Sequence, residues 1–189
     1  MARSAGNLRV RLQQAALELF RERGYERTSA AEIAARVGVT ERTFFRQFAD
    51  KREVLFEGEA VLRTALTASV AEAADGLGPL DTLFHAFGSV APLLEENRPF
   101  AKPRHEIVSR TPALHERETA KLAALADALA VALRERGVEE SRAVLAARTG
   151  MAAFAHATVS WLDDPRPGLG ERLERTRREL ATLLRESER

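Results

Sequence analysis

The chain has 189 residues, enough for one large domain or for a small domain joined to a larger one. It contains no cysteine, which excludes disulfide frameworks, cysteine-ligated metal centres and thiol catalysis. Hydrophobic residues make up 45% and charged residues 30% of the chain. No apolar run reaches the ~18 residues that cross a bilayer, and no secretion signal is found, so we expect a soluble, cytoplasmic protein.

The net charge of +1 is unevenly distributed. Residues 1–52 contain 11 Arg and Lys against 6 Asp and Glu, a net charge of +5, whereas residues 53–189 contain 18 against 22, a net charge of −4. A basic segment of this kind is typical of a protein that binds a polyanion, because phosphate neutralisation provides most of the sequence-independent affinity for nucleic acid. A chance excess of arginine would give the same charge, so charge alone does not establish that this segment binds nucleic acid.

Helical periodicity begins in the first twenty residues. Leucine, alanine and phenylalanine side chains recur three or four residues apart up to Gly24, which predicts a helix over 7–23. Ser29 stands three residues before Glu32, a capping-box pattern that predicts the start of a second, short helix over 30–37.

A third helix is predicted over 41–48, directly after a turn at Gly38. Thr40 can cap this helix, and Phe44 and Phe48 lie four residues apart on one of its faces. A helix, a glycine turn and a second helix at this spacing form a helix-turn-helix, in which the second helix enters the major groove of DNA.

The side chains that point outward from this pair of helices are polar or basic. Arg42 can pair with a guanine edge and Thr43 with a base or a thymine methyl group, whereas Arg46 and Lys51 can hold phosphates. Hydroxyl and N–H groups at the start of the second helix form an anion site. The DNA-binding residues predicted in this way are Thr28, Ser29, Thr40, Arg42, Thr43, Arg46 and Lys51. An ordinary helical hairpin with a solvated charged face is the alternative, which the glycine, the cap and the inward apolar set disfavour.

The rest of the chain repeats the helical pattern. Asp50 and Glu53 predict the start of a long fourth helix that ends near Ala74. Further helices are predicted over 80–94, 112–136, 140–161 and 169–183, with an irregular or short helical stretch ending near 110. The chain is therefore predicted to be all-α, with a DNA-binding head over 1–52 and a helical body over 53–189.

No catalytic, metal or cofactor constellation is predicted. His105 and Glu106 begin a zinc-binding HExxH pattern, but Ser109 stands where the second histidine is needed. We therefore expect neither an enzyme nor a cofactor. A helical adaptor that binds another protein without binding DNA is the alternative function, and the salt dependence of binding would distinguish the two.

The stretch GYERTSAAEIAARVGVTERTFFRQFADKREVL, residues 24–55, resembles the TetR family of bacterial transcriptional repressors. The resemblance implies a three-helix DNA-binding head, a helical ligand-binding body, and a homodimer that occupies a pseudo-palindromic operator until an effector releases it. It also adds Phe45 to the DNA-binding set. The family usually has tyrosine at this position, so the phosphate contact of that hydroxyl is lost here and a packing role is implied. Many members have histidine at the position of Arg46, where arginine would strengthen the phosphate contact.

The body resembles the family more weakly. Residues 98–130 resemble the branch whose regulatory domain is associated with acyl-CoA-like ligands, which implies a small apolar or acyl-type effector. The side chains predicted to line a cavity are Phe84, Phe87, Arg104, His105, Ile107, Arg110, Leu125, Leu129 and His156. The alternative for each of them is ordinary core for the apolar residues and ordinary surface for the polar ones.

A stripe of small residues in 140–161 predicts a close contact between helices. A glycine inside a helix costs ~1 kcal/mol relative to alanine, so Gly150 needs a packing reason. The partner helix belongs either to a second copy of the chain or to the same copy. If the partner helix belongs to a second copy, the predicted dimer residues are Ala143, Ala146, Ala147, Gly150, Phe154, Ala157, Leu173 and Leu180. Two heads held by such a dimer would read half-sites about 34 to 36 Å apart.

Overall fold

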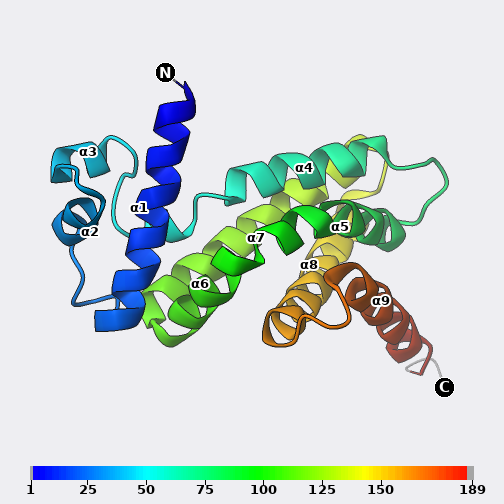
Figure 1. The fold of residues 1–189 in the computed structure, drawn as a ribbon. Coiled ribbons are helices and arrows are strands. Elements are labelled where there is room, and N and C mark those ends of the chain that lie inside the picture. The colour runs from blue at the N-terminus through cyan, green and yellow to red at the C-terminus, as the bar shows by residue number, and fades with distance from the viewer. Residues whose placement is uncertain (1, 187–189) are drawn as a thin grey trace. The chain divides into compact units, whose positions relative to one another are not determined.

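The computed structural model describes residues 2–186, and every regular element within that range is a helix (Figure 1). The predicted all-α class is therefore confirmed. None of the described helices is both long enough and apolar enough to span a bilayer. Contacts divide the chain into two compact units. The first comprises the residues up to Gly58 together with Pro99–Glu118, and the second comprises Glu59–Arg98 and the residues from Thr119 onward.

The first unit, called the head unit below, combines the N-terminal helices with a segment from the middle of the chain. Its elements are α1 (Ala2–Arg23), α2 (Ala30–Val37), α3 (Glu41–Phe45), the 3-10 helix η1 (Glu53–Leu55), α6 (Arg98–Arg110) and the first turns of α7 (Pro112–Glu135). The predicted functional boundary at residue 52 stays a prediction. By packing, residues 53–58 and 99–118 belong with the N-terminal helices.

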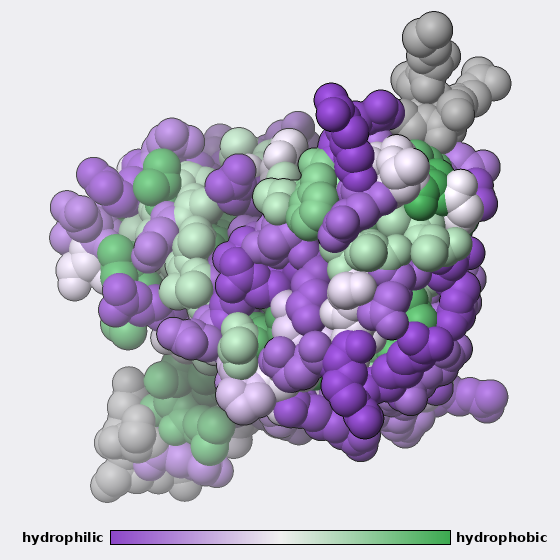
Figure 2. Space-filling view, turned by 90° about the vertical axis from the view of Figure 1, so that its left-hand side faces the viewer, coloured by the Kyte–Doolittle hydropathy of each residue, from purple (hydrophilic) through white to green (hydrophobic). Residues whose placement is uncertain are grey.

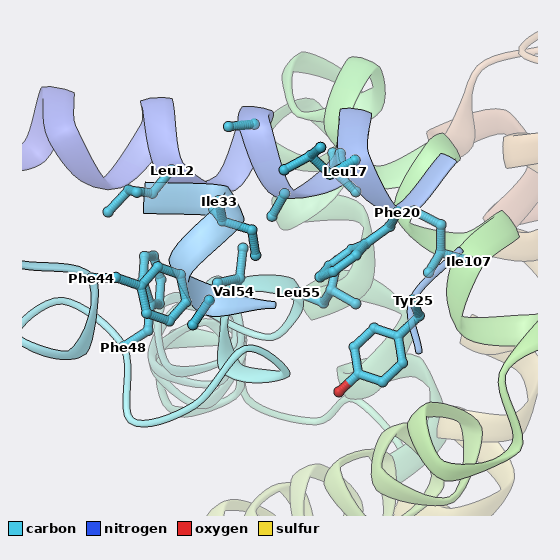
Figure 3. Close-up of a cluster of buried hydrophobic side chains, with 14 of the residues drawn as sticks. Leu12, Leu17, Phe20, Tyr25, Ile33, Phe44, Phe48, Val54, Leu55 and Ile107 are labelled. Atoms are coloured by element: carbon cyan, nitrogen blue, oxygen red, sulfur yellow. The ribbon is translucent and has the colours of Figure 1, made fainter. Parts of the chain in front are cut away.

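One hydrophobic core holds the head unit together. Figure 3 labels ten of its side chains, which are Leu12, Leu17, Phe20, Tyr25, Ile33, Phe44, Phe48, Val54, Leu55 and Ile107. Ile33 of α2 and Phe44 of α3 are fully buried in this core, where α2 packs against α1 and α3 packs against α2. At the other end of the cluster Ile107 of α6 lies near Phe20 and Tyr25 (Figure 3). The head therefore uses apolar residues from α6 that the sequence assigns to the body.

The chain after α3 differs from the predicted long fourth helix. The Asp50 carboxylate accepts hydrogen bonds from the N–H groups of Arg52 (2.7 Å) and Glu53 (3.0 Å), so it caps only the short η1. Phe56 then leaves helical geometry with φ −119° and ψ 10°, and α4 (Glu59–Glu72) begins three residues later. The Asp50 carboxylate meets the Glu53 N–H as the pattern suggests, but the long helix predicted from there is interrupted at the buried Phe56.

Two further boundaries differ from the sequence prediction. α3 ends at Phe45 because the Gln47 N–H bonds to the Phe44 carbonyl at 2.8 Å, which tightens the last turn. The stretch predicted to be irregular or a short helix is helical, and it forms α6 with Pro103 inside it. Pro99 lies in the first turn of that helix, where an N–H has no helical acceptor, so it does not break the helix.

The second unit, called the body unit below, contains the remaining helices. They are α4, α5 (Pro79–Glu96), the rest of α7, α8 (Glu140–Asp163) and α9 (Leu169–Glu186). α5 packs against α4, α8 and α9, and is therefore the central helix of the unit. The ring of Phe87 on α5 is fully buried and lies 4.6 Å from the ring of Phe154 on α8, measured between ring centres.

Gly150 marks the closest approach of α8 to α5. A Cβ atom at this position would lie 2.9 Å from Leu83 Cδ1 and 3.5 Å from Phe87 Cε2. Any side chain here would force Leu83 to shift, because real Cβ contacts are longer. The packing reason for this glycine therefore lies within one copy of the chain.

Candidate nucleic-acid interface

The residues that the sequence predicts to start and end α2 do so in the structure. The Ser29 hydroxyl accepts a hydrogen bond from the Glu32 N–H (3.2 Å), and the Ser29 N–H donates to the Glu32 carboxylate (2.8 Å), which completes the capping box. The Ser29 N–H and hydroxyl hold the pKa of Glu32 below its ordinary value. At the other end Gly38 has φ 79°, a conformation that glycine adopts without strain, and the next N–H, of Val39, bonds to Ala34 O at 3.0 Å.

α3 is a short helix with a fixed inner side. The Thr40 hydroxyl accepts a hydrogen bond from the Thr43 N–H at 3.3 Å and lies 3.0 Å from the Thr43 hydroxyl. Phe44 is fully buried and packs against Phe48, with ring centres 5.5 Å apart. The cap and the buried ring together fix the direction in which α3 presents its outer side.

The outer side of α3 carries two arginines without protein partners. Arg42 and Arg46 are exposed, and within residues 2–186 neither guanidinium has an ion-pair or hydrogen-bond partner. Arg36 on α2 differs, because it donates to the carboxylates of Glu22 (3.0 Å) and Glu18 (3.5 Å) on α1. The charge of α2 is therefore compensated inside the head, whereas the charge of α3 is available to a ligand. Figure 2 shows the face that carries α2 and α3, where hydrophilic residues predominate.

Phe45 lies between these two arginines in the sequence and is also exposed. Its side chain is 51% accessible, and its ring stands edge-on to the ring of Phe44 at 88°, with centres 5.5 Å apart. The packing role implied for Phe45 is thus confined to one edge of the ring, and the rest of the ring faces solvent.

Two other predicted DNA-binding residues have partners inside the head. Thr28 is 2% exposed and its hydroxyl donates to Gly24 O at 3.0 Å. A buried hydroxyl cannot reach a duplex, so the predicted contact by the Thr28 side chain is corrected to a structural role. The Lys51 ammonium donates to Tyr25 O (2.9 Å) and Thr28 O (3.0 Å) and lies 4.1 Å from the centre of the Tyr25 ring. One ammonium N–H remains, and the phosphate contact of Lys51 stays a prediction.

The ring of Tyr25, in the loop before α2, lies beneath the Lys51 ammonium. Burial raises the pKa of the Tyr25 hydroxyl to about 12, so the ring stays neutral at physiological pH. A neutral ring beneath the Lys51 ammonium gives a cation–π contact that joins the loop before α2 to the loop after α3. Lys51 therefore positions the helix-turn-helix whether or not it also meets a phosphate.

Comparisons with known proteins agree with this geometry. Residues 12–57 match the family model described as bacterial regulatory proteins, tetR family, and residues 77–185 match the model described as the MftR C-terminal domain. Together the two models cover both units. The chain belongs to the TetR family.

Three relatives show which kinds of protein this TetR-family chain is similar to. The HTH-type transcriptional regulator TcmR of Streptomyces glaucescens is 40% identical over 82 residues, which span 43% of this chain and 36% of TcmR. The structure of FadR from Thermus thermophilus, described as a TetR family transcriptional repressor in complex with lauroyl-CoA, is 29% identical with a TM-score of 0.59 over 92% of this chain and 93% of FadR. A triclosan complex of SmeT, a repressor from Stenotrophomonas maltophilia, shares the fold at 23% identity and a TM-score of 0.63, over 89% and 88% of the two chains.

The residues predicted to line a ligand cavity fall into both units of this TetR-family chain. Phe84, Phe87, Leu125 and Leu129 are buried in the body unit, and His156 is exposed there. The others, Arg104, His105, Ile107 and Arg110, belong to the head unit. The ligand-cavity role of these nine residues stays a prediction. Helical periodicity marks a residue as inward-facing but does not identify the helix that it faces.

The head-unit members of that set have other surroundings. Ile107 is part of the head core, and Arg110 lines a surface hollow of about 230 Å³ with residues of the turn between α1 and α2. The Arg104 guanidinium donates to Leu55 O at 2.5 Å and to the Glu118 carboxylate at 2.8 Å, and it lies 4.9 Å from the centre of the Phe56 ring. Arg104 thus joins α6 and α7 to η1.

The sequence did not predict that Arg117 would join the contacts made by Arg104. Arg117 on α7 pairs with Glu53 and lies 5.8 Å from the centre of the same Phe56 ring. The only sequence signal is an alternation of arginine and glutamate around residue 117, which is typical of any solvated helix. We call Glu53, Phe56, Arg104, Arg117 and Glu118 the arginine cluster. It holds the 99–118 segment to the end of the helix-turn-helix.

Most residues predicted for a dimer interface are buried within one copy of the chain. Seven of the eight are buried in the body unit, namely Ala143, Ala146, Ala147, Gly150, Phe154, Ala157 and Leu173, and Leu180 is half-buried. The small-residue stripe packs against α5, as the contacts of Gly150 show. The burial of these seven residues agrees with the alternative considered above, packing within one copy, and their place in a dimer interface stays a prediction.

Proposed function

We propose that this protein is a transcriptional repressor of the cytoplasm that occupies a pseudo-palindromic operator as a homodimer and is released by a small-molecule effector. The observation that carries the proposal is the outer side of α3, where Arg42 and Arg46 are exposed without protein partners among the described residues. An α-helix fits the major groove, where a guanidinium can pair with guanine or hold a phosphate. The buried Phe44 and the Thr40 cap give this helix a fixed direction.

The test uses a duplex selected by the protein from genomic fragments. Arg42→Ala should weaken binding to the selected duplex by about 1–3 kcal/mol and reduce the preference over random DNA, because a contact to one base is lost. Arg63→Ala removes the same charge from an exposed position on α4 and should leave the preference unchanged. Equal losses of Arg42→Ala on selected and random duplexes would contradict base reading by this residue.

We place the dimer interface on the outward sides of α8 and α9, which pack against each other in the body unit. These helices expose Leu145 (68%), Val159, Leu183 and Leu184. Exposed apolar side chains on two helices that pack together favour association, because burying them removes apolar surface from water. Leu145→Arg should shift the mass in light scattering toward the monomer. Leu77→Arg, at an exposed leucine before α5, should keep the dimer. A dimer that survives Leu145→Arg would place the interface elsewhere.

An acyl-type effector is supported by the likeness to Thermus thermophilus FadR, which carries lauroyl-CoA. The buried residues Phe84, Phe87, Leu125 and Leu129 supply apolar surface in the body unit, between which an acyl chain would have to insert. Release of the labelled duplex can be followed by fluorescence anisotropy as acyl-CoAs of increasing chain length are added. Coenzyme A without an acyl chain is the control. If no chain length releases the duplex and coenzyme A alone behaves identically, the effector belongs to another class.

The arginine cluster suggests how the effector acts on the head. The chain leaves the body unit after Arg98 and returns to it at Thr119, and the segment between them is fastened to η1 by Arg104 and Arg117. An effector that displaces the body ends of this segment would therefore move the helix-turn-helix, in addition to any tilt of α4. Such coupling is reciprocal, so operator DNA must weaken effector binding by the same factor. Equal effector affinity with and without the duplex would contradict this mechanism.

A further inference from the structure

Phe45 is a large apolar side chain on the surface that we assign to DNA. Its neighbours Phe44 and Phe48 are 0% and 3% exposed, whereas Phe45 is 51% exposed. The contact with Phe44, at 88° between the ring planes, holds the ring in place while about half of the residue stays exposed. Exposed aromatic rings on binding surfaces commonly mark contact sites, because they bury much area at a small entropy cost.

The position of the ring limits what it can contact. Phe45 follows Arg42 by three residues on α3, so the two side chains lie on adjacent parts of the same helix side. Phenylalanine has no hydroxyl or N–H group and can bond neither to a phosphate nor to a polar base edge. The 5-methyl group of thymine is the apolar feature that the major groove offers to such a ring.

We propose that Phe45 is a specificity-determining residue that recognises a thymine through its 5-methyl group. The proposal rests on the proposed function, because it requires α3 to lie in the major groove. It goes beyond that function by assigning one base of each half-site to one apolar side chain. Burying a methyl group contributes about as much as burying one CH₂, which corresponds to a roughly four-fold change in the dissociation constant.

Deoxyuridine tests the proposal because it removes only the methyl group from thymidine. Each thymidine of the selected duplex is replaced in turn by deoxyuridine, and the dissociation constants are measured by anisotropy. For the wild-type protein, the dissociation constant should rise roughly four-fold when one particular thymidine of each half-site is replaced. Phe45→Ala should bind the thymidine and deoxyuridine duplexes equally at that position, and Phe45→Leu should retain part of the difference.

The control variant is Val61→Ala on α4, where the valine is 60% exposed. It should keep the full thymidine preference of the wild type. Helix content by circular dichroism establishes that Phe45→Ala folds, and the deoxyuridine series on the wild-type protein stands whether it does or not.

Two results would overturn the assignment. One is a wild-type affinity that no deoxyuridine replacement changes, and the other is a methyl preference that persists in Phe45→Ala. Either result leaves the proposed function intact if Arg42→Ala still loses its preference for the selected duplex. Failure of the protein to enrich any duplex would refute the proposed function itself.

Discussion

The outer side of α3 in the head unit and the end of α8 in the body unit use arginine differently. On α3 of the head unit, Arg42 and Arg46 are exposed without partners among the described residues. In the body unit, Arg98 donates to Leu162 O at 2.7 Å, and Arg172 donates to the Ser160 hydroxyl at 2.8 Å and to Asp164 O at 2.7 Å. The first pair keeps its hydrogen-bonding capacity for a partner, whereas the second pair fastens helices and loops together. Counting basic residues therefore says less about binding than finding which of them lack partners.

The largest effect on stability and DNA binding is expected from truncating a core side chain of α3. Phe44→Ala should destabilise the protein by about 3–5 kcal/mol and abolish duplex binding, because α3 loses its anchor. Phe87→Ala is the matched truncation in the body unit, where the ring is also fully buried. It should lower the urea midpoint similarly but leave binding to the duplex measurable in buffer. Normal duplex binding by Phe44→Ala would show that α3 does not depend on the core for its direction.

A medium effect is expected at the contact between α5 and α8. Gly150→Leu should destabilise the body by about 1–3 kcal/mol, because its Cβ would lie 2.9 Å from Leu83 Cδ1. Gly88→Ala on α5 is the control, since a Cβ there meets nothing within 4 Å. It should leave stability unchanged or raise it by up to about 1 kcal/mol. Equal urea midpoints for Gly150→Leu and the wild type would disprove the close packing.

The smallest effect is expected at the cap of α2. Hydrogen bonds from Ser29 lower the pKa of Glu32, so the carboxylate stabilises the folded head above its unfolded-state pKa of 4.5. That contribution is lost as the pH falls through the lower folded-state value. Glu32→Gln keeps a capping side chain without a charge. The difference in thermal midpoint between wild type and Glu32→Gln should therefore shrink as the pH falls from about 6 to about 3. A constant difference over that range would mean that the charge does not contribute.

Local signals in the sequence predict the head well. The Ser29 capping box, the Gly38 turn and the Thr40 cap each involve residues within a few positions of one another, so a short window of sequence contains the whole interaction. The same windows give the inward position of Phe44 and the outward positions of Arg42 and Arg46. The helices of the body are predicted for the same reason, because a periodic apolar pattern is local.

Partners that lie far apart in the chain account for what could not be predicted. Gly150 was expected to need a close neighbour, but nothing near it in the sequence names Leu83 as that neighbour. Arg104 contacts Leu55 and Arg117 pairs with Glu53, contacts that join segments about 50 residues or more apart. Phe56, where the predicted fourth helix is interrupted, lies beside Arg104, a neighbour 48 positions away that its local sequence does not name.

The most direct test of the central claim, that the outer side of α3 meets DNA, is the salt dependence of binding to the selected duplex. The logarithm of the affinity should fall steeply and linearly with the logarithm of the salt concentration. Arg46→Ala should reduce that slope by about 0.9 for one lost phosphate contact, and Arg63→Ala should leave it unchanged. An affinity that does not respond to salt, or an identical slope in wild type and Arg46→Ala, would contradict the account and favour a protein adaptor.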